Sequence, residues 1–242
     1  MAAKLQDRIA LVAGASRGIG RASALALAAA GAHVVAVART QGALEELDDE
    51  IQAGGGATTL VPLDLADFDG IDRLGQAVFD RWGRLDVLLG NAGVLGELSP
   101  LPHITPHDWQ RLLDVNLTAN WRLIRSFDPL LRQSEAGRAL FVTSGAANLH
   151  RPFWGGYGMS KAALDSMVKT YAAELANTSA TANLISPGPT ATAMRAKAMP
   201  GEDPETLPSP ADVARLIVAM CATGFTENGV IVSYRDWAHR AG

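Results

Sequence analysis

Short apolar runs alternate with longer mixed segments along most of this chain. The runs span residues 8–13, 33–38, 58–63, 85–89, 139–143 and 181–185, and residues 230–232 form a shorter one near the end. Strands that are buried on both faces have such near-continuous apolar sequences, because helices cover both sides of a parallel sheet. The pattern therefore predicts an α/β fold, with a doubly wound parallel sheet of about seven strands and helices on both faces.

The segments between these runs predict helices. They span residues 21–30, 41–53, 67–82, 106–131, 157–177 and 211–222. Residues 54–56 are all glycine and end the second helix, and Pro106 occupies the first turn of the fourth, where its missing N–H is not needed. One extended irregular stretch is expected, over residues 187–210, which are rich in Pro, Met and Gly.

A glycine-rich loop joins the first predicted strand to the first helix. Gly14, Gly18 and Gly20 give the spacing Gly-x-x-x-Gly-x-Gly. Glycines let the backbone approach a ligand, and the helix N-terminus offers free N–H groups and a positive dipole end to a pyrophosphate. The commonest dinucleotide loop has the spacing Gly-x-Gly-x-x-Gly, and no Gly-Lys-Ser/Thr follows to make a triphosphate loop. A glycine turn with a purely structural role is the alternative interpretation.

Tyr157 and Lys161 are four residues apart on a predicted helix, so they share a face. A free tyrosine, with a pKa of roughly 10, is a poor proton shuttle near neutral pH, and an adjacent ammonium lowers that pKa. Ser144 lies thirteen residues before Tyr157, at a predicted strand end. Such a Tyr/Lys pair also arises by chance in helices, so the other motifs must support a catalytic interpretation.

Composition excludes several classes of function. A chain of 242 residues with 48% hydrophobic content can bury one substantial core, and no linker divides it, which predicts a single domain. The net charge is −4 and there is no basic stripe, so we expect no nucleic-acid partner. No apolar run reaches the roughly 18 residues of a membrane span. With Cys221 as its single cysteine and no signal peptide, the protein is expected to be cytoplasmic, and no metal site is expected.

Together these motifs resemble the short-chain dehydrogenase/reductase family, along nearly the whole chain. The matching segments are Gly14 to Gly20, Asp64-Leu65, Asn91-Ala92-Gly93, the set Asn116, Ser144, Tyr157 and Lys161, and Pro187-Gly188-Pro189-Thr190. The resemblance implies a Rossmann-type fold and a homo-oligomer, either a tetramer or a dimer. Two departures are Ala13, where the family usually has Thr, and Gly90, where many members have Asn. We expect these to reduce local rigidity without affecting the chemistry.

The resemblance also implies catalytic roles for four residues. Tyr157 would be the general acid when a carbonyl is reduced and the base in the reverse direction, while Ser144 would hold the substrate oxygen. Lys161 would lower the pKa of Tyr157 and bind the nicotinamide ribose, and Asn116 would anchor a water linking Lys161 to solvent. The implied cofactor site comprises Gly14, Ser16, Arg17, Gly18, Ile19, Gly20, Arg39, Asp64, Leu65, Asn91, Ala92, Gly93, Tyr157, Lys161, Pro187, Gly188 and Thr190.

The end of the second strand predicts which cofactor is preferred. NAD enzymes place a carboxylate there for the ribose 2′-hydroxyl, whereas this chain has Ala38, followed by Arg39, and carries Arg17 in the glycine loop. A guanidinium can bind phosphate oxygens in a bidentate manner, so we expect NADP(H) to be preferred over NAD(H). The alternative is that both arginines are solvated surface residues.

The sequence is less informative about the substrate. By resemblance, His150, Trp154 and Met194, with Leu95 and Phe153, would form an apolar and aromatic wall of the substrate site. His150 is expected to be a loop residue rather than a catalyst, since Tyr157 fills the acid role.

We therefore predict an NADP(H)-dependent oxidoreductase that interconverts a small-molecule carbonyl and an alcohol. Residues 190–208 are predicted to form a mobile lid. One alternative is a 3-oxoacyl-(acyl carrier protein) reductase, whose acidic carrier would need basic residues beside the cleft, and the candidates are Arg151, Arg195 and Lys197. Another is a non-catalytic dinucleotide-sensing protein.

Overall fold

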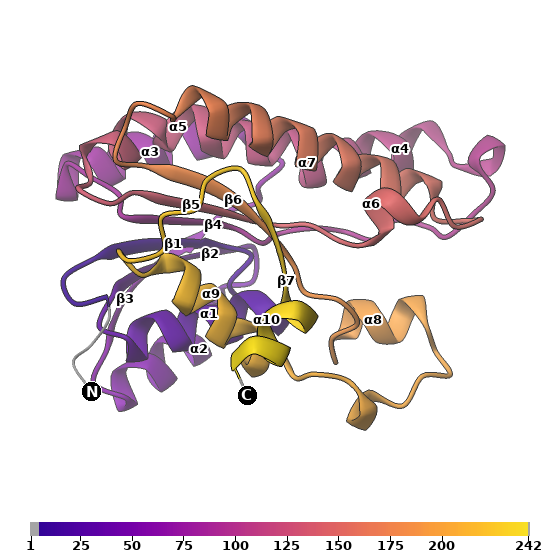
Figure 1. Cartoon of the computed structure of the whole chain (residues 1–242), viewed down its shortest axis with the longest axis horizontal. Helices are drawn as coiled ribbons and strands as arrows, with labels where there is room; N and C mark the ends of the chain where they lie inside the picture. Colours follow the sequence, from indigo (N-terminus) through magenta and orange to yellow (C-terminus); the bar gives the residue numbers. More distant parts are fainter. Residues whose placement is uncertain (1–4, 242) are drawn as a thin grey trace.

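The computed structural model describes residues 5–241 and confirms the doubly wound sheet. Within these residues, seven parallel strands form one sheet in the order β3-β2-β1-β4-β5-β6-β7 (Figure 1). They are β1 (Ile9–Ala13), β2 (His33–Ala38), β3 (Ala57–Pro62), β4 (Val87–Gly90), β5 (Arg138–Val142), β6 (Thr181–Ser186) and β7 (Ile231–Ser233). The strand order reverses between β1 and β4, and this reversal places a crevice at the carboxyl edge of the sheet.

Helices cover both faces of the sheet (Figure 1). One face carries α3 (Phe68–Trp82), α5 (Ala119–Gln133) and α7 (Gly155–Glu174), and the other carries α1 (Gly18–Ala29), α2 (Gln41–Ala53) and α9 (Pro210–Cys221). The shorter helices are α4 (Pro106–Leu113), α6 (Ala146–Leu149), α8 (Ala193–Ala198) and α10 (Tyr234–Ala241), with 3-10 turns η1 (Leu101–His103) and η3 (Pro204–Thr206). None of the helices within residues 5–241 is long and apolar enough to span a bilayer.

Strand β1 shows how the sheet divides the core into two layers. Leu11 packs in a hydrophobic cluster with Phe127 of α5, whereas the next residue, Val12, packs in a second cluster with Ile217 of α9. Successive side chains of a strand point to opposite faces, so both must be apolar when helices cover both faces. This explains why the apolar runs in the sequence are continuous rather than alternating.

The long helix predicted over residues 106–131 is interrupted. After Leu113 the chain forms a π-helical turn, η2 (Asp114–Thr118), before α5 continues. The buried Asn116 lies in this turn, with its side-chain amide bonded to the backbone of Val94. π-Helical turns are rare in proteins, and those that do occur are often found at functional sites. The helical spacing of apolar residues continues on both sides of the turn, so the sequence pattern did not reveal it.

The expectation that residues 187–210 are irregular is wrong in part, because α8 and η3 lie within them. The Thr192 hydroxyl caps α8 by accepting a hydrogen bond from the backbone N–H of Arg195. Arg195 in turn forms a bidentate ion pair with Glu202, which ties the helix to the segment that follows it. Alanine and methionine in α8 favour a helix, although prolines on either side of it suggested a loop.

Gly90 is tightly packed, while the reduced rigidity expected there stays a prediction. A Cβ atom at this position would lie 2.6 Å from Oδ1 of Asn120 and would also overlap the ring of Phe141. Real Cβ atoms do not approach other atoms so closely, so the neighbouring side chains already occupy the space of a larger residue. The glycine is therefore required by the packing of β4 against β5 and α5.

Candidate active site

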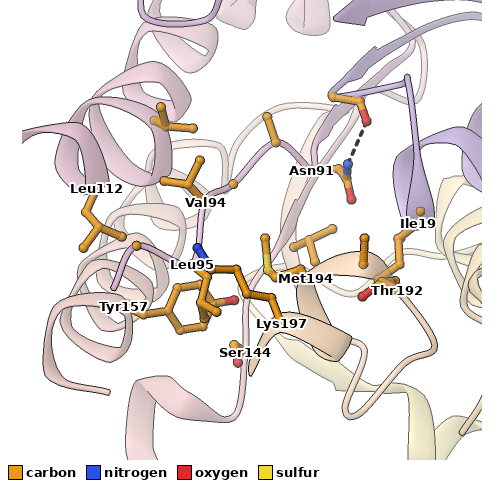
Figure 2. A pocket seen from close by; sticks show the side chains of 18 of the residues that line it. Ile19, Asn91, Val94, Leu95, Leu112, Ser144, Tyr157, Thr192, Met194 and Lys197 are labelled. Atoms are coloured by element: carbon orange, nitrogen blue, oxygen red, sulfur yellow. Dashed lines mark hydrogen bonds between the residues drawn. The ribbon is translucent and has the colours of Figure 1, made fainter. Parts of the chain in front are cut away.

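A single cavity of about 720 Å³ runs along the carboxyl edge of the sheet. It lies where β1, β2, β4, β5 and β6 end, at the reversal of strand order, which is the expected ligand position in this type of fold. Every residue that the resemblance assigns to the cofactor lines the cavity except Gly20, and so do Ser144, Trp154 and Met194. Figure 2 shows part of this lining, including Ser144, Tyr157 and Met194.

The glycine loop is shaped to bring α1 close to the strands. Gly14 has a φ of +83°, and a Cβ atom on it would lie 2.9 Å from Cα of Ala92. A Cβ atom on Gly20 would overlap the Gly14 carbonyl oxygen and the Asn91 side chain, which donates a 3.1 Å hydrogen bond to that oxygen. Gly20 therefore serves the packing of the helix on the loop, and this is why it does not line the cavity.

The first turn of α1 fits an anionic group. Its N-cap, Arg17, makes no side-chain capping bond, and no acidic residue lies in the first turn. The orphan N–H groups and the helix dipole can therefore serve a ligand, as a diphosphate requires. Arg17 and Gly18 both line the cavity at this point. The residues present thus fit the diphosphate of a dinucleotide.

At the far end of the cavity, Arg39 follows the buried end of β2. Its Nη1 atom lies 3.8 Å from Oδ2 of Asp64, and both side chains are about half exposed, at 56% and 51%. An exposed pair at this distance contributes little stability. Arg39 can therefore turn to a stronger partner, and a phosphate is a better match for its planar guanidinium than one loosely held carboxylate.

Tyr157 and Lys161 lie on one face of α7 inside the cavity, as their spacing predicts. Burial raises the pKa of Tyr157, and the nearby Ser144 hydroxyl acts in the opposite direction. Lys161 Nζ donates a 2.8 Å hydrogen bond to the Val142 carbonyl and lies 5.9 Å from the centre of the Tyr157 ring. The role of its ammonium in lowering the pKa of Tyr157 stays a prediction.

Lys161 is itself strongly perturbed. Only 3% of it is exposed, and burial lowers its pKa to about 8, with Asp165 acting in the opposite direction. A lysine with a pKa near 8 can release and regain a proton close to neutral pH, as an ordinary lysine cannot. The site therefore combines a protonated phenol with an amine that titrates in the physiological range.

Asn116 supports the site from behind without lining the cavity. Its Oδ1 accepts from the Val94 N–H at 2.8 Å, and its Nδ2 donates to the Val94 carbonyl at 2.9 Å and to Ser160 Oγ at 3.0 Å. A Cβ atom on Gly93 would lie 3.4 Å from Asn116 Oδ1 and 3.5 Å from Lys161 Nζ, so both groups approach the same backbone. The role of Asn116 in anchoring a water stays a prediction.

The substrate half of the cavity differs in part from the sequence prediction. Leu95, Trp154 and Met194 line it, but His150 does not, nor does Phe153. His150 is exposed at the end of α6, with a φ of 46°. The direction of the His150 side chain is set by the left-handed turn that ends α6. The sequence analysis did not predict this turn.

The sequence analysis also missed several residues that line the cavity. Val94, Leu112 and Val115 extend its apolar wall, and Glu97, His107, Asp108 and Arg111 add charged and polar groups from the loop after β4 and from α4. The helical spacing of Leu112 and Val115 is a signal that they face the interior of the protein. This signal does not show that they face a ligand site. No group of three or more His, Cys, Asp or Glu side chains in the described part of the chain is arranged to hold a metal ion.

Comparison with known proteins agrees with this geometry. The family model described as short chain dehydrogenase matches residues 8–203. The chain belongs to the short-chain dehydrogenase/reductase family. This confirms the resemblance drawn from the motifs, and the protein is an oxidoreductase of that family.

Its relatives within the short-chain dehydrogenase/reductase family include both enzymes and solved structures. The uncharacterized oxidoreductase YciK of Escherichia coli is 37% identical over 88% of this chain and 85% of its own length. A 3-oxoacyl-[acyl-carrier-protein] reductase of Synechocystis is 38% identical over 78% of this chain and 77% of its own. A short chain dehydrogenase of Shigella flexneri, solved in complex with NADP, is 34% identical, with a TM-score of 0.93 over 97% of this chain and 100% of its own.

Proposed function

We propose that this enzyme uses NADP(H) to interconvert a ketone or aldehyde and the corresponding alcohol, with Tyr157 as general acid and base. The observation that carries the proposal is that Ser144, Tyr157 and Lys161 share one cavity with the glycine loop of α1. A bound nicotinamide would donate a hydride to the substrate carbon or accept one from it. The remaining chemistry is the handling of one proton and of the charge on one oxygen.

The side chains are suited to that task in the direction of reduction. Because burial raises the pKa of Tyr157, its phenol is protonated at neutral pH and can donate a proton to the developing alkoxide. Ser144, beside it, can donate a hydrogen bond to the same oxygen and stabilise its charge. Lys161, with a pKa of about 8, can hold a proton near Tyr157 for the next turnover.

The preference for NADP(H) is proposed on the charges around the far end of the cavity. Arg17 and Arg39 line it, and Ala38 stands where a carboxylate would favour NAD(H). The Shigella flexneri relative solved with NADP, and one from Escherichia coli solved with NADPH at 34% identity and a TM-score of 0.91, support this assignment. Among the described residues, Arg39 forms an ion pair with Asp64, and this weak pairing leaves the arginine free to bind a phosphate.

A 3-oxoacyl-(acyl carrier protein) substrate is the second candidate, supported by the Synechocystis relative. Its acidic carrier would need basic residues around the cavity. Of the three candidates, Arg151 does not line the cavity and Arg195 is already paired with Glu202. Lys197 alone of these lines the cavity without an ion pair among the described residues. Because only one of these three basic residues is available to an acidic carrier, a free small molecule is favoured over a carrier-bound one.

The test is NADPH consumption by the purified enzyme against aldehydes, ketones, diketones, ketosteroids and 3-oxoacyl thioesters. Turnover of free carbonyl compounds that exceeds turnover of the acyl thioesters supports the proposal. A strong preference for 3-oxoacyl thioesters would establish the second candidate instead. Tight NADPH binding with no turnover of any compound would indicate a dinucleotide-sensing protein.

A further inference from the structure

Asp165 is a buried carboxylate that the proposed reaction does not use. It lies one helical turn after Lys161 on α7, and only 7% of it is exposed. Its Oδ1 atom is shielded from solvent and has no hydrogen-bond partner among the described residues. A buried carboxylate oxygen without a hydrogen-bond partner is costly. Such a group calls for an explanation that packing alone does not supply.

The surroundings of Asp165 connect it to the active site. Thr143 lies just after Val142, whose carbonyl accepts the hydrogen bond from Lys161 Nζ. Thr143 is 3% exposed, and its hydroxyl also lacks a hydrogen-bond partner within the described structure. This hydroxyl lies near enough to favour the charged carboxylate, although its geometry is not that of a hydrogen bond. The two groups thus form a small polar cluster next to the Val142 carbonyl that binds Lys161.

The charges in this cluster are of opposite sign. Burial raises the pKa of Asp165, while Thr143, Lys169 and Lys161 act in the opposite direction. Among the described residues, Asp165 is the charged group that favours the ammonium form of Lys161 against burial. From other elements, the neutral Val142 carbonyl of β5 accepts the hydrogen bond of Lys161, and the neutral Asn116 amide of η2 approaches the same Gly93 backbone as Lys161 Nζ.

We propose that Asp165 is a positioning residue whose carboxylate keeps Lys161 in its ammonium form within the closed site. An ammonium surrounded by buried side chains needs a nearby negative charge, because desolvation favours the neutral amine. Asp165 supplies that charge from the same helix without lining the cavity. The consequence for turnover rests on the proposed function, whereas the effect on Lys161 itself does not.

The experiment compares the wild type with Asp165→Asn, which removes the charge and keeps the size of the side chain. Carbon-13 NMR of lysine Cε in the protein without cofactor follows the titration of Lys161. The variant should lower the pKa of Lys161 by about one pH unit, because one opposite charge in buried surroundings is lost. Glu174→Gln is the matched control, because it removes the same charge from the exposed end of α7 and should leave Lys161 unchanged.

The rate on a good substrate provides the second readout. At pH values above both titrations, kcat/KM of Asp165→Asn should be about tenfold lower, since one pH unit corresponds to a tenfold change in the ammonium fraction. At lower pH, where Lys161 is charged in both proteins, the two rates should converge. A loss of rate that is equal at every pH would show a merely structural role and overturn the proposal.

The titration decides the proposal even where the other experiments fail. In the wild type, the Lys161 resonance should show a second inflection at acidic pH, when Asp165 becomes protonated, so a poorly folded variant does not prevent the test. A single inflection in the wild type, or an unchanged Lys161 pKa in Asp165→Asn, would overturn the proposal. If no carbonyl compound were turned over, the proposed function would fail while the titration still reported on Asp165.

Discussion

At the scale of single residues, the chemistry depends on the protonation of a phenol that burial keeps neutral. Tyr157 is 9% exposed, packs edge-on against Trp154 at 6.1 Å, and lies beside the Ser144 hydroxyl. Each of these contacts orients the phenol without removing its proton. Tyr157 is therefore suited to donate a proton, and a variant without the hydroxyl tests that role directly.

Tyr157→Phe should bind NADPH nearly as well as the wild type and lose roughly 10²- to 10⁴-fold in turnover, because general acid catalysis contributes about that factor. NADPH affinity by fluorescence and kcat on a good carbonyl substrate measure the two effects separately. A variant that kept more than half the wild-type rate would contradict the assignment of Tyr157.

Arg39 decides cofactor preference if its guanidinium leaves Asp64 for a phosphate. Arg39→Asp should weaken NADPH and improve NADH binding, with a change of about 10- to 100-fold in affinity for one charge-assisted contact of roughly 1.5–3 kcal/mol. The ratio of the two dissociation constants is the measurement. Arg235→Asp makes the same charge change on exposed α10 and should leave the ratio unaltered. If the ratio of the two dissociation constants were the same in Arg39→Asp and Arg235→Asp, Arg39 would be a solvated residue that does not contact the cofactor.

At the scale of elements, close packing decides where glycine is needed. Gly90→Ala should destabilise the protein by about 1–3 kcal/mol, since the new methyl group meets Phe141 and Asn120 in a filled core. Gly42→Ala is the control, because nothing lies within 4 Å of its added Cβ and alanine favours the helix α2. In urea unfolding, the control Gly42→Ala should leave the free energy of unfolding nearly unchanged or increase it. Equal stability of both variants would mean that β4 shifts freely.

The segment over residues 190–208 combines a capped helix with a proline-rich return. The Ala191 N–H bonds to the Pro208 carbonyl, and Arg195 pairs with Glu202, so the segment is tied mainly to itself. We expect NADPH to slow amide hydrogen exchange over residues 190–208, because a bound cofactor adds contacts at its start. Exchange in the remaining helices of the same sample is the internal control. Strong and equal protection without NADPH would show a static segment rather than a mobile lid.

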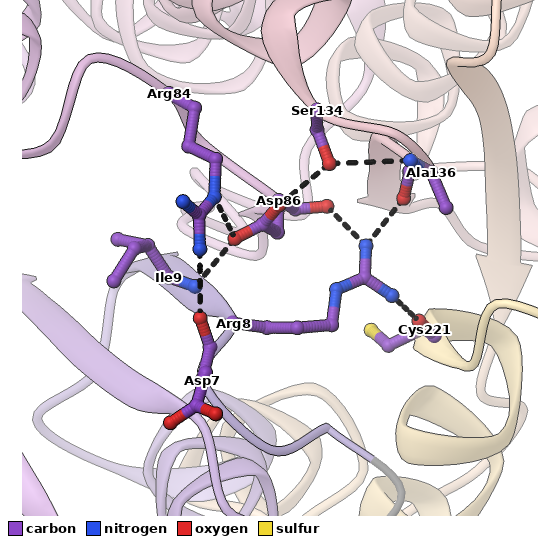
Figure 3. A network of polar contacts seen from close by, with 8 residues as sticks. All are labelled: Asp7, Arg8, Ile9, Arg84, Asp86, Ser134, Ala136 and Cys221. Atoms are coloured by element: carbon purple, nitrogen blue, oxygen red, sulfur yellow. Dashed lines mark hydrogen bonds and ion pairs between the residues drawn. The ribbon is translucent and has the colours of Figure 1, made fainter.

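At the scale of the whole molecule, a polar network joins the chain at the edge of the sheet opposite the cavity (Figure 3). Arg8 donates to the backbone carbonyls of Cys221 and Asp86 at 2.7 and 2.9 Å, and also to that of Ala136. Asp86 in turn accepts from the Ile9 N–H at 2.8 Å. The starts of β1, β4 and β5 and the end of α9 are thereby held together.

Arg8→Met should therefore lower the free energy of unfolding by about 3–5 kcal/mol, because three backbone carbonyls lose their donor and each buried group left without a partner costs about 1–3 kcal/mol. Urea denaturation with an unchanged m-value measures the loss. Arg235→Met, at an exposed site, should change stability little. A loss below about 1 kcal/mol would mean that water replaces the guanidinium.

The homo-oligomer implied by the family resemblance stays a prediction.

Much of the fold was predictable because its determinants are local. Six helices and seven strands were predicted at positions close to those observed, since buried strands and amphipathic helices have different apolar periods. The interruption at η2 and helix α8 were missed. Both depend on particular side-chain bonds, from Asn116 to Val94 and from Thr192 to the Arg195 N–H, rather than on periodicity.

The sequence by itself determined the order of strands and helices, the glycine loop and the shared face of Tyr157 and Lys161, because neighbours along the chain dictate these features. Only the tertiary structure decided that His150 lies outside the cavity and that Lys161 bonds to Val142. It also decided that Asp165, one helical turn after Lys161, is buried. Burial and desolvation depend on residues distant in sequence, so the pKa values in the site could be derived only after folding.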